Sequence, residues 1–144
     1  MPEICVAWLA YCKSDPRPDM TVRRDADSAL KQWLDSRFLE AGSFGLVAEY
    51  GGFAGFLIGR ICDWESVPPV VKPRRIGLID ALYVGKDFRE RGIGSTLLDK
   101  AVDRIRAARA VAVETTYDIG DEASARIWRR ARFEPWMVHA YRML

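Results

Sequence analysis

Long hydrophobic runs are largely missing from this sequence. Residues 4–11 form an uncharged apolar run of only eight residues, whereas a membrane-spanning helix needs about 20. The same run has neither the basic start nor the small-residue cleavage site of a secretory signal. We therefore expect no membrane partner and a cytoplasmic location.

Cysteine, histidine and net charge are also scarce. The 144 residues include three cysteines and one histidine, and the cysteine spacing is not that of a metal-binding knuckle. We expect free thiols in a reducing compartment and no bound metal. Lys and Arg number 22 against 20 Asp and Glu, so the net charge of +2 does not by itself indicate a nucleic-acid partner.

What the chain does contain is the composition of a globular protein, with 49% hydrophobic and 29% charged residues. Its length fits one domain over residues 1–144. Apolar residues at helical spacing predict a first helix over 3–13 and a second that ends at about residue 40. Either Asp25 or Asp27 could act as the N-cap of the second helix. Residues 14–20 contain two prolines and are expected to form a loop.

The hydrophobic period then changes to that of strands alternating with helices. We predict strands over 44–50 and 53–62 joined at Gly51-Gly52, a loop over 63–73, strands over 76–84, 111–115 and 137–143, and helices over 92–108 and 121–131. The helix between the third and fourth strands makes them parallel neighbours. The expected fold class is α/β (α+β), with a mixed, mostly antiparallel central sheet flanked by helices.

The segment from Leu82 to Leu98 is the most informative part of the chain. A strand leads into a turn with Gly92 and Gly94, and the turn opens a long helix. The first backbone N–H groups of a helix have no internal partner and lie at the positive end of its dipole, so an anion such as phosphate fits there. Arg89 and Arg91 add positive charge beside the same point.

Two familiar phosphate-binding motifs do not match this turn. A Walker loop requires a lysine after its last glycine, and Ser95 follows Gly94 directly. A dinucleotide-binding fingerprint requires a third glycine where Leu97 stands. The pattern that remains is Arg-x-x-Gly-x-Gly over residues 89–94.

With this pattern, the chain resembles the GNAT family of N-acetyltransferases, and its order of elements agrees with that family from about Glu3 onward. The resemblance implies that the turn holds the pyrophosphate of acetyl-CoA and that the preceding strand binds the pantetheine arm and splays away from its parallel neighbour. The cofactor-binding residues it implies are Leu82, Tyr83, Val84, Arg89, Glu90, Arg91, Gly92, Ile93, Gly94, Ser95 and Trp128. Relatives are often dimers, so a homodimer is expected. They usually begin with a strand before the first helix. We therefore expect either that this chain lacks that edge strand or that the sequence starts inside a longer natural chain.

A second motif of the family lies in residues 121–133. Aligned at Phe133, it places Trp128 where many relatives have a tyrosine that is proposed to protonate the CoA thiolate. An indole N–H is not a useful acid. Tyr117, just after the neighbouring strand, is a possible substitute, and a plain rim aromatic is an equally good interpretation of it.

Asp80 is the first candidate for the catalytic base. It precedes Val84 by four residues in an apolar strand, and an alkyl ammonium with a pKa near ~10.4 must lose a proton before it attacks. Relatives that act on polyamines and other small amines carry an acidic residue there. The structural alternative is a carboxylate that bonds to a neighbouring loop or faces solvent. Further candidates for the acceptor pocket are Glu49, Asp63, Trp64, Glu65 and Glu114. Each of them is also explained as an ordinary surface residue. His139 is interpreted as structural.

The resemblance implies an acetyl-CoA-dependent N-acetyltransferase that acts on a primary amine of a small molecule by direct attack in a ternary complex. The replacement at Trp128 motivates an alternative, a non-catalytic sensor or interaction module that binds acyl-CoA. A third hypothesis is a nucleic-acid-binding domain that uses the arginines of 126–132, which the net charge does not favour.

Overall fold

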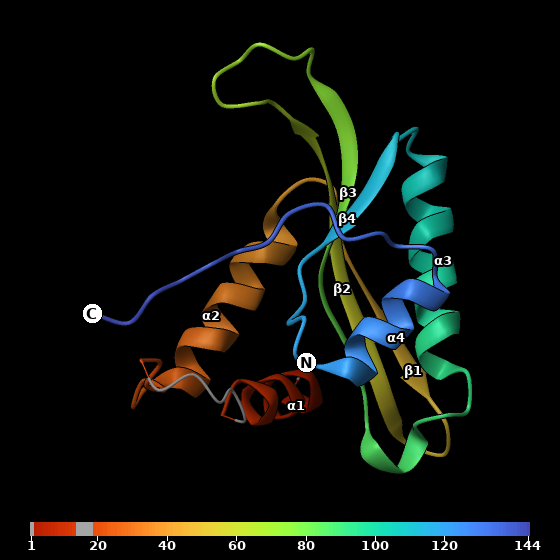
Figure 1. Cartoon of the computed structure of the whole chain (residues 1–144). Coiled ribbons are helices and arrows are strands. Elements are labelled where there is room, and N and C mark those ends of the chain that lie inside the picture. The colour runs from red at the N-terminus through yellow and green to blue at the C-terminus, as the bar shows by residue number, and fades with distance from the viewer. Residues whose placement is uncertain (1, 14–18) are drawn as a thin grey trace.

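The computed structural model describes residues 2–13 and 19–144, and it contains a four-stranded sheet with helices against both faces (Figure 1). In chain order the elements are α1 (Pro2–Lys13), α2 (Ala26–Leu39), β1 (Ser43–Glu49), β2 (Phe53–Trp64), β3 (Arg74–Val84), the 3₁₀ turn η1 (Lys86–Phe88), α3 (Ile93–Ala107), β4 (Ala112–Thr115) and α4 (Glu122–Arg130). This is the mixed fold predicted from the sequence. None of the described helices is long and apolar enough to cross a membrane.

The strands lie in the order β1-β2-β3-β4. β1, β2 and β3 are antiparallel neighbours, and β3 and β4 are parallel, as the helical crossover through α3 predicts. Gly51 and Gly52 close the β1–β2 hairpin with positive φ angles of 68° and 151°, which glycine adopts at little cost. β1 and β4 are therefore the two edges of the sheet.

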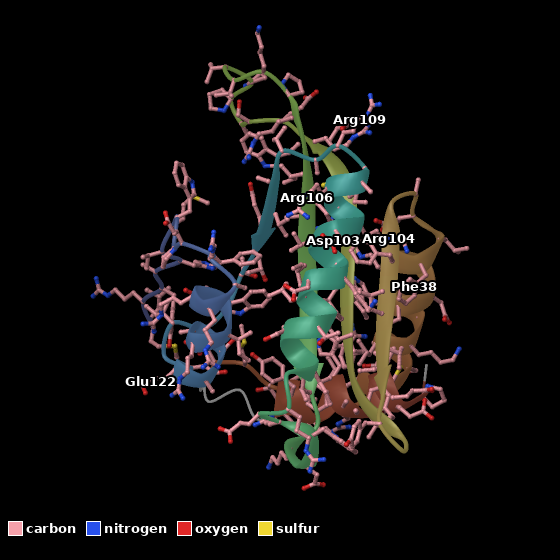
Figure 2. The ribbon with its side chains drawn as sticks, turned by 90° about the vertical axis from the view of Figure 1, so that its right-hand side faces the viewer. Phe38, Asp103, Arg104, Arg106, Arg109 and Glu122 are labelled. Atoms are coloured by element: carbon pink, nitrogen blue, oxygen red, sulfur yellow. The ribbon has the colours of Figure 1, made fainter. Side chains whose placement is uncertain are left out.

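One face of the sheet is covered by α3 and α4. α3 places its apolar stripe against the sheet, and the buried residues of this cluster are Phe44, Leu57, Ile79, Leu97, Leu98, Ala101, Ile105 and Trp128. Figure 2 shows α3 across this face and labels Asp103 and Arg106. These two residues form an ion pair at 2.6 Å. The Arg104 guanidinium lies 5.0 Å from the centre of the Phe44 ring, so its stem covers the margin of the cluster.

The opposite face is covered by α1 and α2. Its buried cluster consists of Ile4, Ala7, Leu34, Phe56 and Ile58. Phe56 and Ile58 alternate along β2 with Leu57, which belongs to the other cluster, because successive side chains of a strand point to opposite faces. β2 is buried on both sides, which explains its nearly continuous apolar sequence.

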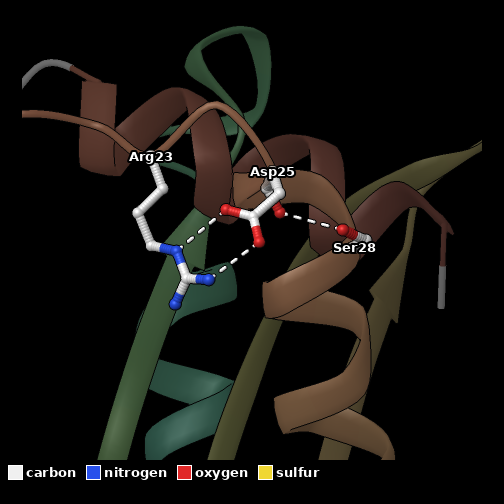
Figure 3. A network of polar contacts seen from close by, with 3 residues as sticks. All are labelled: Arg23, Asp25 and Ser28. Carbon is white, nitrogen blue, oxygen red and sulfur yellow. Dashed lines mark hydrogen bonds and ion pairs between the residues drawn. The ribbon is translucent and has the colours of Figure 1, made fainter.

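The start of α2 differs from the expected capped end. Asp25 stands at the N-cap position, but its carboxylate makes no cap and instead accepts hydrogen bonds from Arg23 Nε and Nη2 at 2.9 and 2.7 Å (Figure 3). The main-chain oxygen of Asp25 accepts the Ser28 hydroxyl at 3.0 Å. Asp27 lies inside the first turn. The side-chain cap predicted for this helix is therefore wrong.

The strand predicted over residues 137–143 is also wrong. These residues belong to no helix or strand, and within the described part of the chain no hydrogen bond involves residues 134–144. Strand-forming side chains are not sufficient, because a strand exists only when its backbone pairs with another. Of the loop predicted over 14–20, residues 14–18 lie outside the described residues, and Asp19 and Met20 belong to no regular element.

Candidate active site

Asp80 is the extra residue of a β-bulge in β3. Ala81 pairs with Ile58 of β2 and Ile79 pairs with Gly59, so Asp80 has no partner across the antiparallel ladder. A bulge turns the strand and re-aims the residue that it leaves unpaired. The carboxylate that the sequence singled out therefore stands at an irregular point of the sheet.

The bulge also switches the faces of β3. Ile79 packs in the cluster under α3, whereas Ala81 and Tyr83 pack against the cluster under α1 and α2, and Leu82 returns to the α3 side. Without an extra residue, positions 79, 81 and 83 would share one face. The bulge thus shifts the alternation of side chains between the two faces of β3 by one residue at Asp80.

The Asp80 carboxylate is largely enclosed, with a side chain that is 18% exposed. Its Oδ1 lies 3.5 Å from Nε of Arg60, a residue of β2 that is itself partly buried. Its Oδ2 is buried and has no hydrogen-bond partner, and the same is true of Arg60 Nε, among the residues that the structure describes. A buried carboxylate oxygen without a partner is costly, and such unsatisfied groups are often found at functional sites. The sequence analysis did not identify Arg60.

β3 and β4 part immediately before Asp80. Their parallel pairing runs from Ile76 with Ala112 to Ile79 with Thr115, whose hydroxyl donates to the Ile79 carbonyl at 3.1 Å. β3 continues to Val84 with β2 alone. The edge of residues 80–84 that faces away from β2 therefore lacks a strand partner, as the resemblance implied.

Backbone groups on this open edge can bind a ligand. The Gly85 N–H donates to Ala54 of β2 at 2.9 Å, whereas the Val84 carbonyl turns the other way and accepts Arg89 Nε at 3.1 Å. Because backbone groups alternate between the two edges of an antiparallel strand, those of Leu82 also face the open edge.

The turn after β3 has the backbone of an anion-binding site. Gly92 is the N-cap of α3 with φ 78°, and Glu90 is left-handed with φ 61°. The helix begins with the Thr96 N–H donating to the Gly92 carbonyl at 2.9 Å. The N–H groups of residues 93–95 precede this bond and have no partner within the helix. The first turn of α3 contains no acidic residue, so the positive end of its dipole is not neutralised locally.

Two arginines border this turn. Arg89 reaches back to the Val84 carbonyl. The Arg91 guanidinium lies 5.6 Å from the centre of the Tyr50 ring, and Tyr50 meets Phe88 edge to face at 6.4 Å. The tip of the β1–β2 hairpin therefore supports the turn, and the residues present fit a bound pyrophosphate.

Trp128 lies in the core rather than on an open surface. It is 5% exposed, and its Nε1 donates to the Ser124 hydroxyl at 3.2 Å. Its ring stacks on Tyr117 at 6.3 Å and meets Phe133 edge to face at 5.1 Å. Tyr117 follows Thr115, the last paired residue of β4, by two residues, and Asp80 directly follows Ile79, the partner of Thr115. The structure thus places Tyr117 and Asp80 after the same last pair of the parallel ladder.

The remaining acidic candidates have ordinary surroundings. Asp63 pairs with Arg75 at 3.0 Å and Glu114 pairs with Arg74 at 2.6 Å, while the Arg74 guanidinium also lies 4.9 Å from the Trp64 ring centre. Two further candidates, Glu49 and Glu65, are exposed, and so is His139, the histidine interpreted as structural. Over residues 2–13 and 19–144 no group of three or more His, Cys, Asp or Glu side chains is arranged to hold a metal ion.

Comparisons with solved structures identify the fold. A transcriptional regulator from Bacillus halodurans superposes with a TM-score of 0.74 at 12% identity, over 99% of this chain and 92% of that one. An aminoglycoside 6′-N-acetyltransferase from Acinetobacter haemolyticus gives a TM-score of 0.69 at 15% identity, over 85% and 83% of the two chains. An aminoglycoside acetyltransferase from an uncultured soil sample, in complex with sisomicin, gives 0.68 at 16% identity, over 99% and 89%.

Sequence comparisons identify the family. The chain is 29% identical over 103 residues to an uncharacterized N-acetyltransferase of Methanocaldococcus jannaschii. That match covers 72% of this chain, which spans 43% of the relative's length. Residues 6–133 match the model of the acetyltransferase (GNAT) family, from α1 through the turn at Gly92 to the end of α4. The chain therefore belongs to the acetyltransferase (GNAT) family.

Proposed function

We propose that this protein is an acetyl-CoA-dependent N-acetyltransferase that acts on a primary amine of a small molecule by direct attack in a ternary complex. One observation carries the proposal: the open edge of β3 over residues 80–84 leads directly into the turn at the start of α3. An unpaired strand edge followed by an anion site suits a long cosubstrate with an amide-containing arm and a pyrophosphate.

The cosubstrate is oriented by backbone groups. The N–H groups of residues 93–95 hold the pyrophosphate, with Arg89 and Arg91 beside it. The open edge at Leu82 and Val84 binds the pantetheine arm and supplies the donor that polarises the thioester carbonyl. The Arg89 side chain donates a hydrogen bond to the Val84 carbonyl at 3.1 Å. A donor of the pantetheine arm replaces this hydrogen bond when the arm binds.

Asp80 takes the proton from the attacking amine. The amine arrives as an ammonium with a pKa near ~10.4, and the buried Oδ2 of Asp80 has no partner in the described structure. Arg60 lies beside Oδ1 and keeps the carboxylate in place. The ammonium binds Oδ2 and transfers its proton there, directly or through one water, and the neutral amine attacks the thioester.

The departing thiolate needs little help, because a free thiol titrates near pH ~8.5. Tyr117 is the hydroxyl that we assign to its protonation. The ring is partly buried against Trp128, and Tyr117, like Asp80, follows the last pair of the β3–β4 ladder. Two of the structural neighbours are named for aminoglycosides, so polycationic amines of that kind come first among the acceptors to be tested.

The test compares Asp80→Asn with Asp99→Asn, the same change on an exposed part of α3. Release of free CoA is measured with a panel of polyamines, aminoglycosides and amino acids, and acetyl-CoA affinity is measured by calorimetry. We expect Asp80→Asn to lower turnover about 10²–10⁴-fold with acetyl-CoA affinity unchanged, and the control to behave as the unsubstituted protein. Equal turnover by all three proteins would exclude Asp80 as the base.

The acyl-CoA sensor is the second candidate function, and the buried Trp128 in the tyrosine position favours it. It differs from the enzyme in one outcome: acetyl-CoA binds, but no amine in the panel releases CoA. In that case the proposed acetyl-CoA site would be retained, and the catalytic roles proposed for Asp80 and Tyr117 would be rejected.

A further inference from the structure

The face of the sheet under α2 changes from apolar to polar at Asp80. Along β2, Phe56 and Ile58 belong to the buried cluster under α1 and α2, and Arg60 follows on the same face because alternate residues of a strand share a face. Ser43 of β1 stands directly opposite Arg60, and Asp80 meets Arg60 from β3. The apolar cluster therefore ends at a polar row, which consists of Ser43, Arg60 and Asp80.

The polar row contains buried atoms that the fold leaves without partners. Within residues 2–13 and 19–144, the buried side-chain atoms without a hydrogen-bond partner are Ser43 Oγ, Arg60 Nε, Asp80 Oδ2 and Arg37 Nε. Arg37 lies in the last turn of α2, and the carbonyl of Glu40, just beyond that turn, accepts the Ser43 N–H at 3.2 Å. Each buried polar atom without a partner requires an explanation, and their concentration around the polar row makes it our candidate for a ligand site.

The charges of this region are balanced before any ligand binds. Asp80 and Arg60 form one ion pair, and Arg37 pairs with Glu40 at 2.7 Å. An acceptor ammonium at Asp80 Oδ2 would therefore add one uncompensated positive charge beside Arg60. The side chains of Asp80 and Arg60 are only 18% and 32% exposed, so water screens this excess charge incompletely. An acceptor that carries a negative charge of its own would restore the balance.

The position of Arg60 decides where that negative charge must lie. Its Nε is 3.5 Å from Asp80 Oδ1, which is too long for a strong hydrogen bond, and a guanidinium suits the two oxygens of a carboxylate. Since Oδ1 and Oδ2 belong to one carboxylate, an amine bound to Oδ2 stands close to the Arg60 guanidinium. The anionic group of the acceptor must then be only a few bonds from its amine, as in an α-amino acid.

We propose that the acceptor is a free α-amino acid, with its ammonium on Asp80 Oδ2 and its carboxylate on the guanidinium of Arg60, beside the Ser43 hydroxyl. The inference rests on the proposed function. The ammonium loses one proton to Asp80, and the neutral amine bonds to the acetyl carbon as the bond from that carbon to the CoA sulfur breaks. The nitrogen then loses a second proton to the departing thiolate, and the products are the N-acetyl amino acid and CoA. Polyamines and aminoglycosides have no anionic group and are expected to be poorer acceptors.

The test compares each α-amino acid with its carboxamide, which keeps the amine and the side chain and loses the negative charge. Release of CoA from acetyl-CoA gives kcat/KM, and calorimetry with CoA present gives the affinity of each compound without reaction. We expect the preferred amino acid to exceed its carboxamide by about 10–100-fold, the loss that follows when a hydrogen bond to a charged group is removed. The amine of the carboxamide is less basic and more often neutral, so amine reactivity alone would favour the carboxamide.

The ratio of amino acid to carboxamide is measured in three variants, because a general loss of activity or stability affects both compounds alike. Arg60→Gln is expected to reduce the ratio to about one. Arg60→Lys keeps the charge without the planar fork and is expected to give an intermediate ratio, and it replaces Arg60→Gln if that variant does not fold by circular dichroism. Arg106→Gln makes the same change at an exposed residue of α3 and should leave the ratio unchanged.

The outcomes separate this inference from the proposed function. Equal use of the two compounds by the unsubstituted protein overturns the inference and leaves the N-acetyltransferase in place. A preference that Arg60→Gln and Arg60→Lys do not reduce overturns it as well, since another residue then holds the carboxylate. If no compound releases CoA, the proposed enzyme is rejected and the affinities decide: tighter binding of the amino acid that is lost in Arg60→Gln supports the inference, and equal or absent binding overturns it.

Discussion

Gly77 lies where α3 comes closest to the sheet. A Cβ at this position would overlap three carbons of Ile105, which is 1% exposed and cannot move aside. Gly94, in the first turn of the same helix, has only ordinary contact distances, with Val84 Cγ2 at 3.5 Å. Glycine is therefore present at the two positions for different reasons. At position 77 the packing leaves no room for a side chain, and at position 94 the missing side chain leaves the backbone accessible.

Substitution of each glycine by alanine distinguishes these two reasons. Gly77→Ala is expected to lower the free energy of unfolding by about 1–3 kcal/mol, because the added methyl overpacks a filled core. Gly94→Ala is expected to leave stability unchanged or to raise it by up to about 1 kcal/mol, since alanine favours a helix. Urea unfolding measures both. In the double variant Gly77→Ala with Ile105→Ala the losses should be less than additive, and strict additivity would show that the two side chains do not compete for space.

At the scale of elements, a local ion pair between Arg23 and Asp25 lies at the start of α2. The hydrogen bonds from Arg23 lower the pKa of Asp25 below its ordinary value of 3.8. A depressed folded-state pKa means that the pair stabilises the fold above pH 3.8, and that this contribution is lost as the pH falls through the folded pKa of Asp25. Both side chains are exposed, so the effect is local.

Arg23→Gln is the variant that tests this assignment. The pKa of Asp25, followed by NMR titration of its carboxyl carbon, is expected to rise toward its ordinary value when the guanidinium is removed. Arg24→Gln removes the same charge one residue away and should leave that pKa unchanged. An equal rise in both variants would mean that general charge, and not the hydrogen-bonded pair, sets the pKa.

The elements that sequence reasoning predicted correctly are those specified by local patterns. The helices over 3–13 and 92–108 follow from apolar spacing, and the first hairpin follows from Gly51-Gly52 between two apolar runs. The strand over 137–143 failed because pairing is a non-local property that side-chain alternation does not encode. The bulge at Asp80 and the neighbouring Arg60 were missed for the same reason: both depend on the register between β2 and β3.

For the whole molecule, the parting of β3 and β4 leaves one edge of residues 80–84 without a strand partner at the proposed donor site. A cosubstrate that occupies the open edge and the turn at Gly92 should therefore stabilise the entire fold. At about 100 times its dissociation constant a ligand adds about 2.7 kcal/mol, and acetyl-CoA is expected to raise the unfolding temperature by about 5–10 °C.

Gly92→Asp should largely remove this shift, because it places a carboxylate at the positive end of α3. Gly51→Asp is the matched control, since Gly51 has a similar φ of 68° and, like Gly92, open space around it. Both variants carry similar backbone strain and the same added charge, and only the first places that charge at the N-terminus of α3. A shift that is equal in the two proteins would mean that the turn does not hold the pyrophosphate.

The bulge in β3 has a consequence for how such chains diverge. Removal of residue 80 would restore regular alternation, so an ancestor or descendant without the bulge would differ from this chain by a one-residue gap at that point and not by a substitution. That single deletion would eliminate the carboxylate and leave residues 81–84 on the faces that they now occupy. The acidic group can therefore be gained or lost as one event in the gene, while the pairing of residues 81–84 with β2 and the open edge opposite it are kept.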